Sequence, residues 1–234
     1  MINNSLFITG TDTSVGKTFV GARFLEFLKT KGIQAGYQKW IATGVEAEVP
    51  EDLALCLDAA GISPTPELAA QHVPYCFRFP ASPHLAAEME DRTVAAEHII
   101  ENYKALASRY EWLIVEGVGG LMVPLRRDLL LVDLLAQLQP KTLVVARSGL
   151  GTLNHTLLTL EALRHRQIPV LGVVFSDSAA EEDEMLVQDN MQTIEEIGLV
   201  RVFGRLQRHR SASDARSAFM PIGHAILEQL HHTK

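Results

Sequence analysis

The sequence predicts an α/β fold, in which helices cover both faces of a mostly parallel β-sheet. Short apolar runs rich in β-branched and aromatic residues alternate with segments of helical periodicity, as in βαβ units. The runs are nearly continuous in apolar character, as expected of strands buried on both faces. At 234 residues, 47% of them hydrophobic, the chain can bury one large core. We therefore expect a single domain over residues 1–234.

Five apolar runs are clear strand candidates and a sixth is weaker. The clear ones are residues 6–9, 112–115, 142–146, 170–175 and 200–203, and the weaker one is 35–38. Helical spacing of apolar residues predicts a helix over residues 17–31, which Gly32 ends. Ser82 and Pro83 read as a cap and a first-turn proline before a helix over 84–89.

The remaining predicted helices follow from the same periodicity. They cover residues 53–60, 94–110, 129–139, 153–166, 184–197 and 222–231. Two long segments, 62–79 and 205–216, show no clear pattern, and we expect them to be functional loops because long loops in compact domains often contact ligands or move.

Charge and cysteine content exclude several classes of protein. A net charge of −7 disfavours nucleic-acid binding, which needs a basic face, but it allows a phosphate ligand in a local cradle. The two cysteines, Cys56 and Cys76, are too few and too far apart for a zinc cluster or a disulfide scaffold. No window approaches the ~20 apolar residues of a membrane span. We expect a cytoplasmic protein with neither nucleic-acid nor membrane partners.

A glycine-rich turn between the first strand and the first helix predicts a phosphate-binding loop, the P-loop. Its residues are Gly10-Thr11-Asp12-Thr13-Ser14-Val15-Gly16-Lys17-Thr18. Backbone N–H groups of such a turn and the helix N-terminus face a polyphosphate, the lysine reaches its β- and γ-phosphates, and the following hydroxyl binds Mg²⁺. The fold is therefore predicted to be P-loop NTPase-like, with nucleotide contacts from Asp12, Thr13, Ser14, Val15, Gly16, Lys17, Thr18 and Phe19.

The spacing of this loop departs from the strict pattern. Five residues rather than four separate Gly10 from Gly16, and Thr11 occupies the strict glycine position. The P-loop switch ATPases that position partners or cargo carry a second lysine where Asp12 stands. They remain an alternative, which this residue disfavours.

Three charged residues outside the loop are candidates for the same site. Glu116 ends a buried strand beside glycines and is a good magnesium ligand. Asp52 reads equally as a second metal ligand or as a helix N-cap. Lys39 follows the weak strand, and its pattern alone favours a solvated edge charge over a catalytic cation. A cluster near the C-terminus, which either closes over a nucleotide or forms a solvated turn, contains Arg205, Arg208, His209, Arg210 and Arg216.

Five motifs, in this order along the chain, together resemble the dethiobiotin synthetases. The P-loop matches with its five-residue spacing, and residues 36–44 (Gly-Tyr-Gln-Lys-Trp-Ile-Ala-Thr-Gly) resemble the lysine segment of that family. Pro74-Tyr75 with residues 80–84 forms the next landmark, followed by residues 115–120 and 150–156. An alternative with similar chemistry, a corrin-pathway synthase, would need a glutaminase domain for which the chain has no room.

The resemblance implies a reaction and roles for the candidate residues. In the family, 7,8-diaminopelargonate takes up CO₂ as a carbamate, ATP phosphorylates the carbamate, and the second amine closes the ring with loss of phosphate. Lys17 and Lys39 would flank the carbamate and the γ-phosphate. Thr18, Asp52 and Glu116 would hold Mg²⁺. Thr13 and Thr43 would orient the substrates and complete the catalytic set, with Val118 and Gly119 also in contact with substrate.

The resemblance also implies a homodimer whose substrate site lies at the interface, with Leu150 and Asn154 acting from the second subunit. Four departures from the family pattern are visible: Trp40 replaces a proline, Gly149 replaces a basic residue, Ser176-Asp177 replaces an adenine-reading asparagine, and Gln207 replaces a proline. Because a serine lacks the two-sided amide that suits adenine, the preferred base of the nucleoside triphosphate stays open. Ser176 and Asp177 are nonetheless expected to contact the nucleotide.

Overall fold

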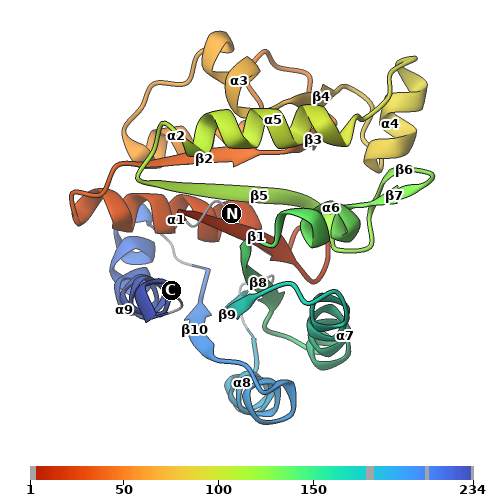
Figure 1. Cartoon of the computed structure of the whole chain (residues 1–234). Coiled ribbons are helices and arrows are strands. Elements are labelled where there is room, and N and C mark those ends of the chain that lie inside the picture. Colours follow the sequence, from red (N-terminus) through yellow and green to blue (C-terminus); the bar gives the residue numbers. More distant parts are fainter. Residues whose placement is uncertain (1–3, 178–181, 209–210, 233–234) are drawn as a thin grey trace.

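A six-stranded parallel sheet forms the centre of the molecule (Figure 1). The computed structural model describes residues 4–177, 182–208 and 211–232. In spatial order the strands are β10 (Val202–Leu206), β9 (Val170–Ser176), β8 (Lys141–Arg147), β1 (Ser5–Gly10), β5 (Trp112–Gly120) and β2 (Ala35–Lys39). The predicted α/β fold, with its parallel sheet, is confirmed.

Helices pack on both faces of this sheet, as predicted. Successive residues of β1 point to opposite faces, so Phe7 enters one apolar cluster while Leu6 and Ile8 enter the other. The cluster around Phe7 includes residues of α5 (Ala96–Ala107), α6 (Leu131–Leu138), α7 (Thr152–His165) and α8 (Glu184–Gly198). The cluster around Ile8 includes residues of α1 (Lys17–Thr30), α2 (Glu51–Ala60) and α9 (Ala212–His232).

Two small sheets and two short helices complete the described structure. Strand β3 (Ile41–Thr43) pairs in parallel with β4 (Tyr75–Phe77), and β6 (Pro124–Arg126) pairs antiparallel with β7 (Leu129–Leu130). The short helices are α3 (Pro66–His72) and α4 (Pro83–Met89). Ser82 is the N-cap residue of α4, and Pro83 is its first residue, as the sequence predicts.

Several predicted boundaries are wrong. Segment 62–79 is not an irregular loop, because Thr65 caps α3 by accepting from the Leu68 N–H and β4 follows it. Segment 205–216 contains the end of β10 and the first turn of α9. The last strand begins at Val202 rather than residue 200, β5 runs on to Gly120, and β7 takes the first two residues of the helix predicted over 129–139.

Helix α9 begins at Ala212, ten residues before its predicted start, and contains Pro221, which made a helix start after the proline the natural prediction. Pro221 lacks the N–H that a helix interior uses, which costs about 3 kcal/mol or more. Phe219 and Ile222 on either side of it are buried in the cluster that also contains α1, and the Phe219 ring lies 6.4 Å from that of Phe24. Burial of these side chains offsets the lost hydrogen bond.

Candidate active site

The P-loop connects β1 to α1 and requires glycine at its last position before the helix. Gly16 is the N-cap of α1 and has a φ of 95°, a left-handed conformation that glycine adopts without strain. A Cβ at this position would also lie 2.4 Å from Ser176 Oγ at the end of β9. No side chain caps the helix, so its first N–H groups remain suited to an anion.

Lys17, the first residue of α1, is folded back over this loop. Its ammonium donates to the backbone oxygen of Asp12 at 3.0 Å, and the residue is buried. Burial lowers the pKa of Lys17 to about 8, while the negative charge of Glu116 partly opposes that effect. The lysine is therefore an ammonium at neutral pH in a place where water screens its charge poorly.

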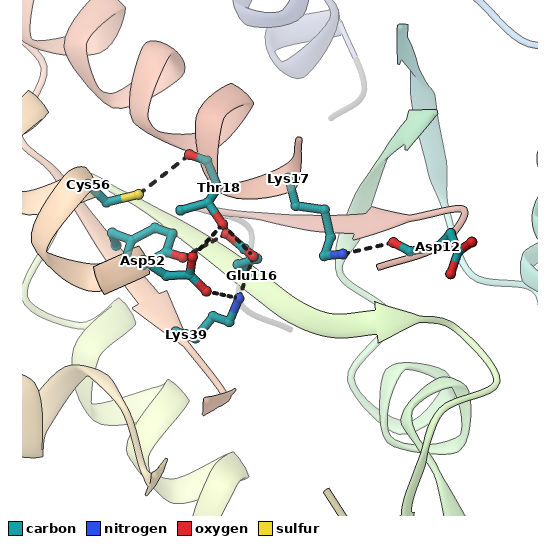
Figure 2. A network of polar contacts seen from close by, with 8 residues as sticks. Asp12, Lys17, Thr18, Lys39, Asp52, Cys56 and Glu116 are labelled. Atoms are coloured by element: carbon teal, nitrogen blue, oxygen red, sulfur yellow. Dashed lines mark hydrogen bonds and ion pairs between the residues drawn. The ribbon is translucent and has the colours of Figure 1, made fainter. Parts of the chain in front are cut away.

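Four side chains from α1, β2, α2 and β5 converge beside the P-loop (Figure 2). The Lys39 ammonium lies 2.5 Å from Glu116 Oε1 and 2.6 Å from Asp52 Oδ2. Thr18 Oγ1 lies 3.0 Å from both Glu116 Oε1 and Asp52 Oδ1. Since a hydroxyl carries one proton, Thr18 can donate to only one of these carboxylates at a time. At any moment one of the two carboxylate oxygens that face Thr18 Oγ1 therefore lacks its proton.

Strand register explains why Lys39 reaches this cluster. Lys39 pairs with Glu116 across β2 and β5. Lys39 is 6% exposed and Glu116 is 1% exposed, so the interpretation of Lys39 as a solvated edge charge is wrong. Burial opposes the charge of Lys39, but Glu116 and Asp52 outweigh it and raise its pKa.

Asp52 is not the N-cap of its helix. Pro50 holds that position in α2, and Asp52 lies in the first turn with its carboxylate on Lys39 and Thr18. Burial opposes ionisation of Asp52, yet the Lys39 charge and hydrogen bonds from Lys39 and Thr18 lower its pKa below the ordinary range. The carboxylate is therefore ionised and faces the site.

The donor set fits a hard divalent cation. Mg²⁺ prefers carboxylate and hydroxyl oxygens and commonly takes one or two carboxylates together with substrate phosphates. Thr18, Asp52 and Glu116 offer such oxygens next to the phosphate loop. Over residues 4–177, 182–208 and 211–232, no group of three or more His, Cys, Asp and Glu side chains is placed to hold a metal by itself. The remaining ligands would have to come from phosphate and water.

One cleft of about 820 Å³ joins most of the predicted site residues. It is bounded by the P-loop and α1, by β2 and β3, by the start of α2 and by the end of β5. The predicted residues that line it are Thr13, Ser14, Gly16, Lys17, Thr18, Phe19, Lys39, Thr43, Asp52, Glu116, Val118 and Gly119.

Four predicted nucleotide-binding residues do not line the cleft. Val15 and Ser176 are buried, the latter against Gly16. The Asp12 carboxylate accepts from the Thr13 N–H and forms an ion pair with Arg147 at 2.8 Å. Both oxygens of Asp177 accept from Arg205, at 2.8 and 2.9 Å. Their contacts with a nucleotide stay predictions.

The two residues predicted to act from a second subunit also lie outside the cleft. Leu150, before α7, is 85% exposed, and Asn154, in the first turn of α7, is exposed as well. Neither is among the residues that line the cleft beside the P-loop of its own chain.

The arginine cluster near the C-terminus is engaged elsewhere. Arg205 forms ion pairs with Asp177 and Glu184, and Arg216 pairs with Glu26 of α1. His209 and Arg210 lie outside the described residues. Arg205 thus links β10 to α8 and to the end of β9, and Arg216 links α9 to α1, while the role of the cluster toward a nucleotide stays a prediction.

One residue of the site is absent from the predictions. The hydroxyl of Tyr37 donates to Glu116 Oε2, and the two oxygens are 2.7 Å apart. Tyr37 is buried in the core beneath the cleft. In the sequence Tyr37 reads as an aromatic strand residue, and its partner is 79 positions away. Only alternation along β2, which puts Tyr37 on the same face as Lys39, gives a hint of this contact.

The parallel sheet, the strand–loop–helix turn and the carboxylates beside it define a P-loop nucleoside-triphosphate-dependent protein. Residues 4–216 match the family model described as AAA domain. Solved structures with this fold include McdA from Cyanothece (14% identity, TM-score 0.57, covering 97% of this chain and 96% of that one) and MinD from Aquifex aeolicus (15%, 0.51, 98% and 96%). At such identities they show the fold alone.

Proteins of similar sequence identify the family within this class of P-loop proteins. The chain is 37% identical to the ATP-dependent dethiobiotin synthetase BioD of Methanococcus vannielii, over 85% of this chain and 91% of that one. It is 43% identical to the enzyme of that name from Anaeromyxobacter sp., over 86% of each chain. The chain belongs to the dethiobiotin synthetase family, and the predicted assignment to an ATP-dependent ligase is confirmed.

None of the helices in the described ranges combines the length and the apolar character that a membrane-spanning helix requires.

Proposed function

We propose that the cleft beside the P-loop carries out phosphoryl transfer to a carbamate, and that ring closure of 7,8-diaminopelargonate follows in the same cleft. The convergence of Lys17, Lys39, Thr18, Asp52 and Glu116 supports this proposal, because it puts two ammonium groups and two carboxylates at the mouth of a phosphate loop. Phosphoryl transfer needs mainly positioning and charge neutralisation, and the residues of this cleft offer both.

The triphosphate would lie against the P-loop and the N-terminus of α1, with Lys17 turning from the Asp12 carbonyl to the β- and γ-phosphates. Thr18, Asp52 and Glu116 would hold the magnesium ion. When bound, Mg²⁺ neutralises charge that develops on the transferred phosphoryl group.

The carbamate would form when one amine of the diamine attacks CO₂ and loses a proton. A carbamate oxygen then attacks the γ-phosphorus, and the bond from that phosphorus to the oxygen of the departing ADP breaks. The second amine attacks the carbamate carbon, inorganic phosphate leaves, and the amine loses a proton as the ring closes. Lys39, Thr43 and Thr13 line the cleft where the carbamate would lie, and their N–H and O–H groups would orient it.

The substrate carboxylate would be bound by a second copy of the chain. The exposure of Leu150 and the absence of Asn154 from the cleft of its own chain support a homodimer in which these residues reach the partner's cleft. Val118 and Gly119 at the end of β5 would contact the diamine from within the chain.

Phosphate release tests the proposal. Initial rates with ATP and Mg²⁺ should require both diaminopelargonate and bicarbonate, and omission of either should abolish phosphate release. Release that is independent of the diamine but stimulated by a protein partner would instead identify a P-loop switch ATPase.

A further inference from the structure

Glu116 is held from two directions by residues of one strand. Tyr37 and Lys39 are two positions apart on β2, so both side chains point to the face that α1 and α2 cover. Lys39 contacts Glu116 Oε1, on the side of the cleft, while Tyr37 contacts Oε2, on the side of the core. The two oxygens of this carboxylate therefore have different partners and different environments.

The phenol is a fixed donor. Tyr37 is 1% exposed, its ring packs in the core with residues of α1 and α2, and its backbone oxygen contacts His72 Nδ1 at 2.5 Å. Burial, followed by the charge of Glu116, holds the pKa of Tyr37 well above its ordinary value. The neighbouring Cys56 thiol is also kept neutral, because burial raises its pKa. The single O–H of Tyr37 donates to Glu116 Oε2 at 2.7 Å, and the packing of its ring fixes the direction of that donor.

The hydrogen bond from Tyr37 determines how the Glu116 carboxylate is oriented toward the cleft. With Oε2 engaged by Tyr37, rotation of the carboxylate is restricted and Oε1 faces Thr18 and Lys39. Without the phenol proton, Oε2 would be a buried charged oxygen lacking this donor, and the carboxylate would reorient toward another one. Removal of a group that orients a metal ligand typically lowers metal affinity or activity by about 10–100-fold.

We propose that Tyr37 is a positioning residue, which orients the Glu116 carboxylate toward the magnesium–triphosphate through its hydrogen bond to Oε2. The inference rests on the proposed function, in which Glu116 is a metal ligand. It assigns Tyr37 no contact with nucleotide or diamine.

The experiment measures how strongly Mg²⁺ and nucleotide binding are coupled. The Kd of a β,γ-imido analogue of ATP is determined with Mg²⁺ and with EDTA, and the ratio of the two values reports the metal's contribution. We expect Tyr37→Phe to reduce this ratio by about 10–100-fold while the Kd in EDTA stays within about threefold of that of the unmodified enzyme. Its kcat should recover as the Mg²⁺ concentration rises, and its KM for the diamine should not change.

Tyr103→Phe is the matched control. Its hydroxyl is also buried, but it bonds to the neutral Ser5 Oγ on the opposite face of the sheet. This variant should keep the wild-type ratio. A loss of the same size in Tyr103→Phe would show that any buried hydroxyl deletion disturbs the site, which would overturn the inference.

Glu116→Gln distinguishes the metal role of Glu116 from the positioning role of Tyr37. If it removes the coupling while folded Tyr37→Phe keeps the wild-type ratio, the metal role of Glu116 stands and the positioning role of Tyr37 is overturned. If Glu116→Gln also keeps the wild-type ratio, the proposed metal site fails and the inference fails with it.

A second substitution keeps the test open if Tyr37→Phe does not fold. Incorporation of 4-aminophenylalanine at position 37 replaces the hydroxyl by an N–H donor of similar size. We expect a coupling ratio within about threefold of that of the unmodified enzyme, because a donor to Oε2 is retained. A folded protein with this side chain and a coupling as weak as that of Glu116→Gln would overturn the proposal.

Discussion

The two sides of the P-loop are built differently. On the side of α2 and β5, Lys39, Asp52, Glu116 and Thr18 contact one another and line an open cleft. On the side of β9, Asp177 is committed to Arg205 in a closed ion pair, 4% and 9% exposed. The side of α2 and β5 thus presents charged groups to a ligand, whereas on the side of β9 the Asp177 carboxylate is occupied by Arg205.

The largest expected effect on this comparison is the fall in kcat when Lys17 is removed from the side of the P-loop that faces the cleft. Lys17→Ala should lower kcat by more than about 100-fold, since removal of one preorganised electrostatic donor costs about 2.7–4 kcal/mol in the transition state. Steady-state rates of phosphate release measure it. Lys29→Ala, an exposed lysine in the last turn of the same helix, is the control and should be unaffected. Near-normal turnover of Lys17→Ala would remove this lysine from the mechanism.

A subunit-mixing experiment would break or extend the comparison, because it asks whether a second copy of the chain contributes Asn154 to the cleft. Asn154→Ala alone should lower kcat/KM for the diamine by about 10–100-fold, the equivalent of one or two lost polar contacts. Mixed with Lys17→Ala, it should recover about one quarter of wild-type activity. Half of randomly assembled dimers are mixed, and each of these holds one intact site. No recovery on mixing would place Asn154 in the cleft of its own chain or outside the site.

A smaller effect comes from the protonation of Lys17. Burial lowers its pKa to about 8, so the ammonium is present below that pH and is lost as pH rises through it. Bound polyphosphate favours the charged form, and binding above pH 8 must take up a proton. Nucleotide affinity should therefore fall by up to about tenfold per pH unit in that range. Calorimetry in buffers of different ionisation enthalpy measures both the nucleotide affinity and the number of protons taken up on binding. Lys17→Arg, which stays charged, should give a flat profile, and a flat profile in the unmodified enzyme would contradict this assignment.

The smallest expected effect concerns the base of the nucleotide. Ser176 is buried against Gly16 and the Asp177 carboxylate is occupied by Arg205, so neither of these two residues offers a free side-chain amide to the base. Initial rates with ATP, CTP and GTP should differ by less than about tenfold, the value of one lost hydrogen bond. Strong selectivity for ATP would show that other groups read the base.

Regular periodicity made most of the fold predictable. The central strands and the helices over 17–31, 153–166 and 184–197 follow from apolar runs and 3.6-residue spacing. Segment 62–79 was harder because its helix is one and a half to two turns long and its strand has three residues, too short for a period to show. In α9, Pro221 made a continuous helix hard to predict from the sequence, because tertiary packing stabilises the helix around it.

The site was predictable where local pattern determines it. The P-loop follows from one continuous motif, and Glu116 was found because it follows an apolar run and precedes glycines, although in the structure it lies within β5 rather than at its end. The burial of Lys39 depends on pairing with β5 and on cover from α2, both of which are remote in sequence. The contact of Tyr37 with Glu116 depends on the same register, and no local pattern distinguishes it from ordinary core packing.

The indole of Trp40 gives this cleft an optical reporter. It directly follows Lys39, is 1% exposed, and stacks at a tilt on Phe7 with ring centroids 4.7 Å apart. The other tryptophan, Trp112, is the first residue of β5 and does not line the cleft. Displacement of Lys39 by an incoming ligand would change the surroundings of one fluorophore and leave the second as an internal reference, so occupancy of the site can be followed by emission without any label.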